Sequence, residues 1–569
     1  MSNQPYKPTT GTDAPRRPDR IKDVSDFFAA GGTPAQLMAL VEAAPIYMPP
    51  AEAPPTGPGV RIEIGPDEYR VVGEALAALA SEPDIFCRGG LLVRTIRADP
   101  SGLGRAQGPL TIAPLPGANL RERLTARCEL LKLKTGEWIQ AHPPPWLVEA
   151  LLARGEWPGL RPLAGVSDIP VLRRDGSLHA TPGYDAITCT VYAPRGRRPD
   201  VPTNPSRADA VAAMQRVLDP VCDFGFETPE HRAAWLATLL TAVGRTAFDG
   251  PAPATLIDSN VRGSGKGLLA QIVGIVATGS DLSPYTYTND SEELRKKITA
   301  VAIAGDRVVF LDNIDGDFGN DSLDRALTAT RWRDRILGRS ELVDLPLLAT
   351  WIGTGNNVAV AADTCRRLIH VRLDVLYEHP EDRTDFRYPD LLGHVREYRV
   401  ALAGDALTIL GAFIQGGERI VGLTGLGSFE GWSRTIREAI IWVGLPDPAK
   451  TRIALTEKAD TTKETLRMLI AAFKAYAGAE AVAIGPMMDE LYGQHPPRAD
   501  PAAEAMRGAL VMLTGTPAGR PPSAHVVGKR LAKYCRRVID REYLDRGGRS
   551  RLGQTWRVVP TNREPGDEG

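Results

Sequence analysis

The chain has 569 residues, and its 68 Lys and Arg against 69 Asp and Glu give a formal net charge of −1. This near-neutral balance excludes a protein that binds nucleic acid through overall positive charge. Hydrophobic and charged contents of 43% and 24% are ordinary for a globular protein. No apolar run approaches the roughly 20 residues of a membrane span, and the N-terminus, MSNQPYKPTTGTDAPRRPDR, lacks the hydrophobic stretch of a secretory signal. We therefore expect a cytoplasmic protein of several domains with no membrane contact.

The cysteines and histidines are not spaced as metal ligands. The six cysteines include no CxxC pair, and the eight histidines show no HExxH or similar spacing. We therefore expect reduced thiols rather than a disulfide framework or a structural zinc site.

The N-terminal third divides into an arm and a first domain. Residues 1–57 are rich in Pro, Ala and Thr, which predicts a flexible arm with one short helix near Thr33–Ala44. Residues 58–200 predict an α+β domain, with strands at VRIEIG, YRVV, GLLVRTI and PLTIAPL and helices at EALAALAS and NLRERLTARCELLKL. The turn-rich segment Ile169–Pro194 predicts a β-hairpin. No pair of acids of the hDhD type occurs in this domain, so we assign it no polymerase chemistry and expect a recognition or collar role. Asp175, His179 and Asp185 are explained by the polarity of turns.

Residues 206–400 predict an α/β domain with a parallel sheet. Two helices are followed by the strand-like TLIDS, a glycine loop, the helices GLLAQIVGIVA and SEELRKKITAVAIAG, and the apolar strands in RVVFLDNIDG, LLATWIGTGNN and RRLIHVRLD. Strands that alternate with helices form parallel sheets, whose ligands bind at the carboxyl ends of the strands. We expect a helical segment over 401–455, a separate unit over 456–560 and a tail over 561–569.

The glycine loop, in IDSNVRGSGKGLL, is close to the phosphate-binding pattern G-x-x-x-x-G-K-[ST]. A loop between a strand and a helix N-terminus offers backbone N–H groups and a helix dipole to phosphate. The residues expected to bind nucleotide are Gly263, Ser264, Gly265, Lys266 and Gly267. Two positions depart from the pattern, because Asn260 replaces the first glycine and Gly267 replaces the hydroxyl residue that contacts Mg²⁺.

Polar residues at the ends of later strands complete a nucleotide-hydrolysing site. VVFL is followed by Asp312, which is in the position of a Walker B carboxylate that holds Mg²⁺ directly or through water. ATWIGTG is followed by Asn356 and Asn357, either of which is suited to orient the attacking water. The pair Arg366–Arg367 comes next, and an arginine at a subunit boundary stabilises charge on the γ-phosphate.

The order GSGKG, FLDN, GTGNN and RR resembles that of the AAA+ ATPases of the superfamily 3 helicase group. The resemblance is closest to the phage and plasmid primase-helicase branch, similar to the poxvirus-type primase-helicase, and covers about residues 165–450. It rests also on PGYDAITCTVY, LDRALTATRWRDRILGRSE, TGNNVAVAADTCRRLIHVRLD and GSFEGWSRTIREAIIWVGLPDP. It implies hexameric rings with ATP between subunits and DNA through the centre. It further implies that Lys266 is the Walker A lysine, Asp312 the Walker B aspartate, Asn356 or Asn357 the sensor, and Arg366 or Arg367 the arginine finger.

Members of this group carry a β-hairpin with a basic, DNA-contacting residue between the Walker B strand and the sensor. The corresponding segment here is RWRDRILGRSELVDLP, so Arg335 and Arg339 are the expected DNA contacts. The alternative is that these arginines form salt bridges with Asp334, Glu341 or Asp344.

Two departures affect hydrolysis more than binding. Gly267 provides no hydroxyl for Mg²⁺, so that ligand must be a water or another side chain. Asn313 stands where many relatives have a second acid, the usual base for the attacking water, and Asp315 is a possible substitute. ATP binding is therefore expected, while the rate of hydrolysis stays open.

The C-terminal unit predicts a winged helix that binds DNA. Between Lys529 and Arg557 there are ten Lys and Arg against three acids. The basic helix AHVVGKRLAKYCRRVIDREYL, the turn DRGGRSR and the strand TWRVV are typical of that fold. The residues expected to face phosphate are Lys529, Arg530, Lys533, Arg536 and Arg537 on the helix and Arg549 and Arg551 in the wing. The alternative is a structural winged helix that packs on the ring.

Together these features predict an ATP- and Mg²⁺-dependent DNA helicase or translocase of a phage, plasmid or integrative element. It would act as a ring, a hexamer, on single-stranded or forked DNA in replication, with a separate primase or replication protein as a further partner. Two alternatives stay open. One is a weakly hydrolysing or non-hydrolysing DNA-binding initiator or loader, and the other is an AAA+ defence or regulatory ATPase that acts on a protein.

Overall fold

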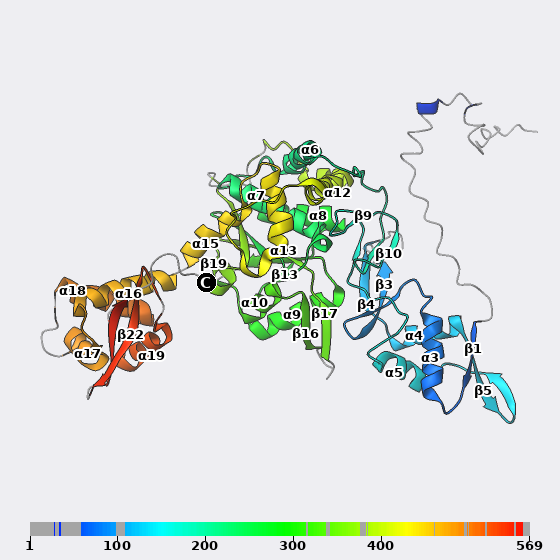
Figure 1. Cartoon of the computed structure of the whole chain (residues 1–569), viewed down its shortest axis with the longest axis horizontal. Helices are drawn as coiled ribbons and strands as arrows, with labels where there is room; N and C mark the ends of the chain where they lie inside the picture. The colour runs from blue at the N-terminus through cyan, green and yellow to red at the C-terminus, as the bar shows by residue number, and fades with distance from the viewer. Residues whose placement is uncertain are drawn as a thin grey trace, which may run out of the picture. The chain divides into compact units, whose positions relative to one another are not determined.

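A computed structural model of the chain describes Phe28 and residues 33–35, 59–97, 108–314, 317–336, 342–375, 383, 385–459, 461–493, 498, 500–517, 520–536, 538–550 and 553–561. Most of the predicted arm over 1–57, its helix near Thr33–Ala44, and residues 562–569 lie outside these ranges. The chain divides into two compact units, Met1–Gly57 with Arg195–Arg198 and Pro58–Pro194 with Pro199–Gly569. The helices and strands described below belong to the second unit (Figure 1). The finer domain boundaries stay predictions.

The first part of the second unit contains helices packed on a three-stranded sheet. The sheet consists of β1 (Val60–Ile64), β5 (Cys128–Lys134) and β6 (Glu137–Gln140), with β1 parallel to β5 and β6 antiparallel to it. Helices α3 (Glu68–Leu79), α4 (Gly117–Arg127) and α5 (Pro145–Ala153) share one apolar core with it.

Two predictions in this part were wrong. YRVV lies inside α3, because the Asp67 side chain caps the helix and Val72, Ala75, Leu76 and Leu79 recur at helical spacing on its buried face. CELLKL is not the end of a helix but strand β5, which pairs along its length with β1 and β6. The pairing partners that decide the second case lie far away in the sequence.

The remaining strands of this part are short. They are β2 (Ile85–Arg88), β3 (Leu91–Arg97) and β4 (Leu110–Pro114), then β7 (Gly165–Ser167), β8 (Val171–Leu172), β9 (Leu178–His179), β10 (Gly183–Asp185) and β11 (Thr190–Tyr192). The single hairpin predicted over Ile169–Pro194 is instead two, β8–β9 and β10–β11, and β11 also pairs parallel to β7. Asp175 accepts hydrogen bonds from Ser177, and Asp185 pairs with Arg173, as expected for turn-stabilising acids.

The predicted parallel sheet is confirmed. Its strands are β12 (Ala254–Ser259), β13 (Tyr285–Thr286), β14 (Val308–Ile314), β18 (Thr350–Asn356) and β20 (Leu368–Leu373), and their order is β13-β14-β18-β12-β20. Every pair of neighbours is parallel. The carboxyl ends of β12, β14 and β18 therefore meet at one edge of the sheet.

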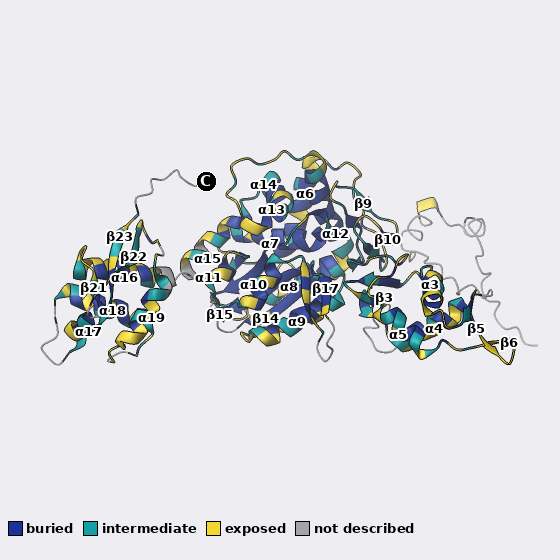
Figure 2. Cartoon of the chain, turned by 60° about the horizontal axis from the view of Figure 1, so that its bottom comes forward, coloured by how far each residue is buried: buried dark blue, intermediate teal, exposed yellow. Residues whose placement is uncertain are grey.

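Helices cover both faces of this sheet, and its centre is buried (Figure 2). Ile257 and Phe310 pack in a core with α6 (Arg207–Leu218), α7 (Pro229–Val243), α8 (Lys266–Thr278) and α12 (Leu391–Gly416). Leu256 and Leu311 pack in another core with α9 (Ser291–Ala304) and α10 (Asp321–Thr328). Consecutive strand residues point to opposite faces, so a sheet covered on both sides needs the continuous apolar runs seen in the sequence.

The predicted hairpin between β14 and β18 is present. It consists of β16 (Arg331–Arg335) and β17 (Leu342–Pro346), which pair antiparallel. Trp332 is fully buried in the core with α9 and α10, while Arg331, Arg333 and Arg335 are exposed on the other side of β16. The short strands β15 (Asp317–Phe318) and β19 (Ala359–Val360) pair with each other, and α11 (Ala362–Cys365) precedes β20.

Several helices follow residue 400. They include the end of α12, then α13 (Glu430–Trp432), a π-helical turn (Ser433–Arg437), α14 (Glu438–Trp442) and α15 (Thr451–Ala459). Among the described residues, no helix combines the length and the hydrophobicity that crossing a membrane requires.

The C-terminal part has its own apolar core. Its elements are α16 (Thr461–Ala477), β21 (Val482–Ala483), α17 (Ile484–Tyr492), α18 (Pro501–Thr514), α19 (Ala524–Tyr534), β22 (Glu542–Ser550) and β23 (Gly553–Pro560). The strands form an antiparallel sheet in the order β21-β23-β22. The prediction of a turn over DRGGRSR was wrong for most of that segment. Residues 545–550 continue β22 with an irregular register between Arg546 and Arg549, where Thr555 and Gln554 side chains bond the glycine carbonyls.

Candidate nucleotide site

The glycine loop joins the end of β12 to the start of α8. Gly263 (φ 73°) and Gly265 (φ 86°) have left-handed backbones, which cost other residues roughly 1–2 kcal/mol. A Cβ on Gly265 would lie 2.7 Å from the Phe224 ring, so that glycine is also required by close packing. The first N–H groups of α8 have no partner within the helix, and the positive end of its dipole faces the loop. The loop is therefore built as an anion site.

Asn260, the first departure from the loop pattern, has a structural role. Its side chain donates to Asp374 Oδ1 at 3.1 Å and to Val375 O at 3.0 Å, and it accepts from Val375 N at 3.2 Å. These bonds join the loop to the segment after β20. A glycine could not make them, so the departure stabilises the loop's position.

Lys266 is held at the start of α8. Its Nζ donates to Asn356 Oδ1 at 2.8 Å, to Ser264 Oγ at 2.9 Å and to Val261 O at 3.3 Å. Burial lowers the pKa of the Lys266 ammonium, and the negative charges of Asp258 and Asp312 act in the opposite direction. An ammonium held by neutral oxygens near carboxylates is suited to exchange those oxygens for phosphate.

Lys266, Asp312 and Asn356 line one cavity of about 460 Å³ beside the glycine loop. Asp312 lies near the end of β14, and Asn356 is the last residue of β18, the next strand in the sheet. The hydroxyl of Thr354, on β18, donates to the Asp312 carboxylate. The cavity thus combines backbone N–H groups, a cation, a carboxylate and an amide.

Asn313 lies beside the same cavity with a left-handed backbone (φ 53°), and its N–H is 3.4 Å from Thr354 Oγ1. A carboxamide does not accept a proton from water as a carboxylate does. Asp315, the possible substitute base, lies outside the described residues.

The two neighbouring asparagines have different contacts. Asn356 accepts from Lys266, whereas Asn357 accepts from Arg372 Nη2 at 3.0 Å and is 3.4 Å from Asn260 O. Arg372 also forms an ion pair with Asp258 at 2.6 Å. Sequence reasoning missed Arg372 and Thr354, although both occupy the ends of apolar strands, the same signal that identified Asp312.

The structure places Arg366 and Arg367 away from their own chain's loop. Arg367 O accepts from the N–H of Ala254, the first residue of β12, while the glycine loop follows the last. Arg367 lies 3.3 Å from Asp324, and Arg366 pairs with Asp363 with 69% of its side chain exposed. Because the strands are parallel, these arginines lie at the amino-terminal edge of the sheet, whereas Lys266 lies at the carboxyl-terminal edge.

The cavity fits a magnesium ion that arrives with a nucleotide. The described residues contain no group of three or more His, Cys, Asp or Glu that could hold a metal by themselves. Mg²⁺ in phosphate sites takes one or two carboxylates and keeps substrate phosphates and waters as its other ligands. Asp312 and the phosphate-binding loop match that donor set.

A second cavity of about 650 Å³ adjoins the loop and shares Gly263, Ser264 and Gly265 with the first. It is lined mainly by apolar and aromatic side chains, among them Phe224, Phe386, Tyr388, Leu391 and Leu392. Its volume and lining suit a nucleoside. Sequence reasoning missed it, because its aromatic residues come from separate segments before β12 and after β20.

Replacing Phe224 with alanine should weaken ATP binding about 10-fold and leave the binding of inorganic triphosphate unchanged. Stacking of a base on an aromatic ring contributes roughly 1–3 kcal/mol, and triphosphate has no base. Competition with a fluorescent ATP analogue measures both affinities. Tyr69→Ala, at an exposed tyrosine on α3, is the control. Equal losses for ATP and triphosphate would show that Phe224 only supports the loop.

The hairpin places its arginines at the surface. Arg335 is exposed, whereas Arg339 lies outside the described residues. Of the acids considered as alternative partners, Asp334 pairs with Arg295 and Asp344 pairs with Arg331, while Glu341 lies outside the described residues. Arg333, which sequence reasoning did not single out, is exposed on the same side of β16.

The basic residues of the C-terminal part are only partly described. On α19, Lys529 and Arg530 are exposed while Val527 and Leu531 are buried, so the helix presents a basic face. The predicted helix over AHVVGKRLAKYCRRVIDREYL was too long, because α19 ends at Tyr534 and Glu542–Leu544 belong to β22. Arg536 therefore lies after the helix, where it is exposed and pairs with Asp545. Arg537 and Arg551, and the side chains of Lys533 and Arg549, lie outside the described residues.

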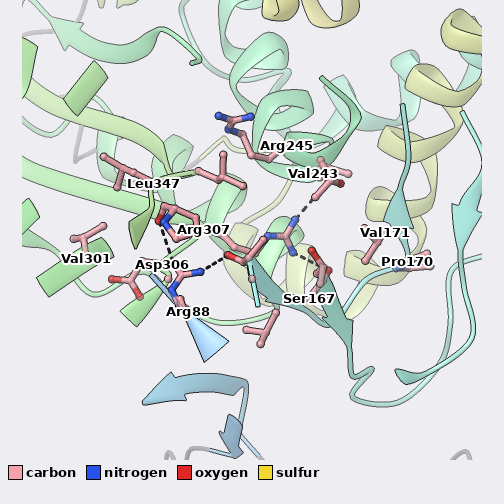
Figure 3. Close-up of a pocket in the computed structure, with 18 residues that line it drawn as sticks. Arg88, Ser167, Pro170, Val171, Val243, Arg245, Val301, Asp306, Arg307 and Leu347 are labelled. Carbon is pink, nitrogen blue, oxygen red and sulfur yellow. Dashed lines mark hydrogen bonds between the residues drawn. The ribbon is translucent and has the colours of Figure 1, made fainter. Parts of the chain in front are cut away.

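A third cavity, shown in Figure 3, is not suited to a nucleotide. Its volume is about 40 Å³, room for little more than water. The arginines on its wall are bonded to backbone carbonyls and a serine. Arg307 donates to Ala242 O and Ser167 Oγ, and Arg88 donates to Leu163 O. These arginines join segments of the fold.

No protein-family model and no curated protein matches the chain. Among solved structures, it is similar to the A form apo structure of the NrS-1 C terminal region, with a TM-score of 0.35 and 10% identity over 86% of this chain and 99% of that one. The SCCmec type IV Cch helicase gives a TM-score of 0.32 and 12% identity over 83% and 94% of the two chains. The JCV helicase gives 0.20 and 12% over 46% and 70%. Similarities at this level assign no function.

Proposed function

We propose that this protein binds ATP with Mg²⁺ and uses its hydrolysis to move on DNA, as a helicase or translocase of a phage, plasmid or integrative element. The observation that carries the proposal is the convergence of Lys266, Asp312 and Asn356 on one cavity beside the glycine loop. In this proposal Lys266 binds the outer phosphates and Asp312 holds Mg²⁺. Asn356 is the sensor, because it contacts Lys266, whereas Asn357 is bonded to Arg372.

The proposed assembly is a ring, a hexamer, with ATP between subunits. Arg366 supports this arrangement, because an arginine at the sheet edge opposite Lys266 reaches a nucleotide only in a neighbouring copy. Arg366 is the better candidate for this contact, since it is largely exposed while Arg367 lies beside Asp324. An arginine supplied by a neighbour stabilises the charge of the transferred phosphoryl group.

The proposed DNA contacts are on the β16–β17 hairpin and on α19. Arg333 and Arg335 are exposed on one side of β16, and Trp332 is buried on the other side. The helix and strand order of the C-terminal part, with α19 before the β22–β23 hairpin, supports a winged helix whose Lys529 and Arg530 face phosphate.

Wild-type protein should hydrolyse ATP faster with forked DNA, and the double variant Arg333→Ala/Arg335→Ala should lose that stimulation while keeping its DNA-free rate. Each lost phosphate contact should also reduce the salt dependence of DNA binding, log K against log [salt], by about 1. Phosphate release and fluorescence anisotropy with labelled forked DNA measure the two effects.

The control is Arg232→Ala/Arg434→Ala, at two exposed arginines outside the hairpin. If the hairpin variant binds DNA as tightly as wild type, the β16–β17 hairpin does not contact DNA. Wild-type ATPase activity that DNA never stimulates would favour the ATPase that acts on a protein partner.

Asn313 favours a second candidate, an initiator or loader that assembles on DNA with ATP and hydrolyses it slowly. The reason is that Asn313 offers no carboxylate to the attacking water. ATP-dependent ring assembly without turnover in the experiment above would establish this candidate over the motor.

A further inference from the structure

We propose that Thr354 supplies the hydroxyl ligand for Mg²⁺ that the glycine loop lacks at Gly267. The inference rests on the proposed function, because it concerns the metal that accompanies the bound nucleotide. In this proposal a threonine on strand β18 replaces the hydroxyl that Gly267 does not provide.

Thr354 lies between the two elements that a magnesium ion must contact. Its strand, β18, is hydrogen-bonded to β14, which carries Asp312, and to β12, which leads into the glycine loop. Thr354 pairs in register with Ile257, two residues before the end of β12. A hydroxyl at this position is therefore beside both the carboxylate and the phosphate loop.

The hydroxyl has the correct bonding for a ligand. Thr354 Oγ1 donates a hydrogen bond to Asp312 and accepts one from the Asn313 N–H at 3.4 Å. A hydroxyl has one proton and two lone pairs, so a lone pair stays available after these contacts. The residue is 2% exposed yet belongs to the wall of the nucleotide cavity.

There is room for a side chain at Gly267, where the loop pattern has its hydroxyl residue. Gly267 is the second residue of α8 and lines the same cavity, and a Cβ built on it meets no atom within 4 Å. A side chain at Gly267 is therefore sterically allowed. This makes a transfer of the hydroxyl from β18 back to the loop a practical experiment.

The test is the Mg²⁺ dependence of nucleotide binding, measured by titrating Mg²⁺ into the full-length protein with a fluorescent ATP analogue. Thr354→Val should weaken Mg²⁺ about 10-fold, in the range for a lost metal-site group, and leave binding without metal unchanged. Thr354→Ser should behave as wild type. Thr354→Val/Gly267→Thr should recover most of the loss, because the hydroxyl returns on the loop.

Replacing the Thr354 hydroxyl with a thiol tests directly whether this side chain contacts the metal. Thr354→Cys should weaken Mg²⁺ and favour Cd²⁺ relative to wild type, because thiolates prefer soft metals. Its similar volume keeps this variant informative even where Thr354→Val does not fold. An unchanged ratio of Cd²⁺ to Mg²⁺ affinity would overturn the proposal. So would a loss in Thr354→Val that Gly267→Thr does not recover, since Thr354 would then only orient Asp312.

These outcomes are separable from failure of the proposed function. Lys266→Ala tests nucleotide binding with and without metal. If wild type and Lys266→Ala bind the analogue equally in the absence of Mg²⁺, the nucleotide site itself is wrong. If Lys266 matters and Thr354 does not, only the metal assignment falls.

Discussion

Replacing Lys266 with alanine should reduce ATP affinity by about 100-fold and abolish hydrolysis. Hydrogen bonds to a charged group contribute roughly 1.5–3 kcal/mol each, and loss of the lysine also leaves the charge of the phosphates uncompensated at the loop. Isothermal titration calorimetry with ATP and Mg²⁺ measures the affinity. The free energy of unfolding should change little, because the partners of Lys266 Nζ in the nucleotide-free protein are neutral oxygens beside an open cavity.

The matched control is Lys296→Ala, which removes a lysine that pairs with Glu293 on α9. It should bind ATP as wild type does. Equal affinities of Lys266→Ala and Lys296→Ala for ATP would show that the glycine loop does not bind its phosphates.

Replacing Trp235 with alanine should lower the free energy of unfolding by about 3–5 kcal/mol, the cost of a large cavity in a core. Trp235 is fully buried on α7, and its Nε1 donates to Leu269 O of α8 at 3.2 Å. The substitution therefore also loosens the helix whose first residue is Lys266. We expect weaker ATP binding together with a lower urea midpoint of unfolding. Circular dichroism measures that midpoint without relying on tryptophan fluorescence.

Two variants calibrate this result. Trp138→Ala, at a tryptophan that is 40% exposed on β6, should change the free energy of unfolding by less than about 1 kcal/mol. Trp235→Phe should fall between the two, because it keeps most of the ring volume and loses the N–H. A loss below about 1 kcal/mol in Trp235→Ala would contradict the packing of α7 against α8.

The central sheet could be predicted from the sequence because its signals are local. The runs that became β12, β14, β18 and β20 begin with mainly apolar residues, as strands covered on both faces require, and other elements separate each from the next. Such patterns depend on neighbours within a few residues. Polar residues at the strand ends, among them Asp312 and Asn356, then follow at the carboxyl edge of a parallel sheet.

The errors arose where distant partners decided the structure. CELLKL has a pattern that suits a helix or a strand, and pairing with β1, more than 60 residues earlier, made it a strand. The extent of β22 was likewise decided by β23 and by side chains that bond its glycine carbonyls.

The sequence by itself determined a glycine loop with its lysine between a strand and a helix, and a carboxylate and an amide near the ends of later strands. These features depend on patterns of consecutive residues. Only the tertiary structure decided the strand order that puts Thr354 beside Asp312. It also separated the contacts of Asn356 from those of Asn357, and it placed Arg366 at the edge opposite Lys266. The physical reason is that strand order and register are set by packing among segments far apart in the chain, which no local pattern encodes.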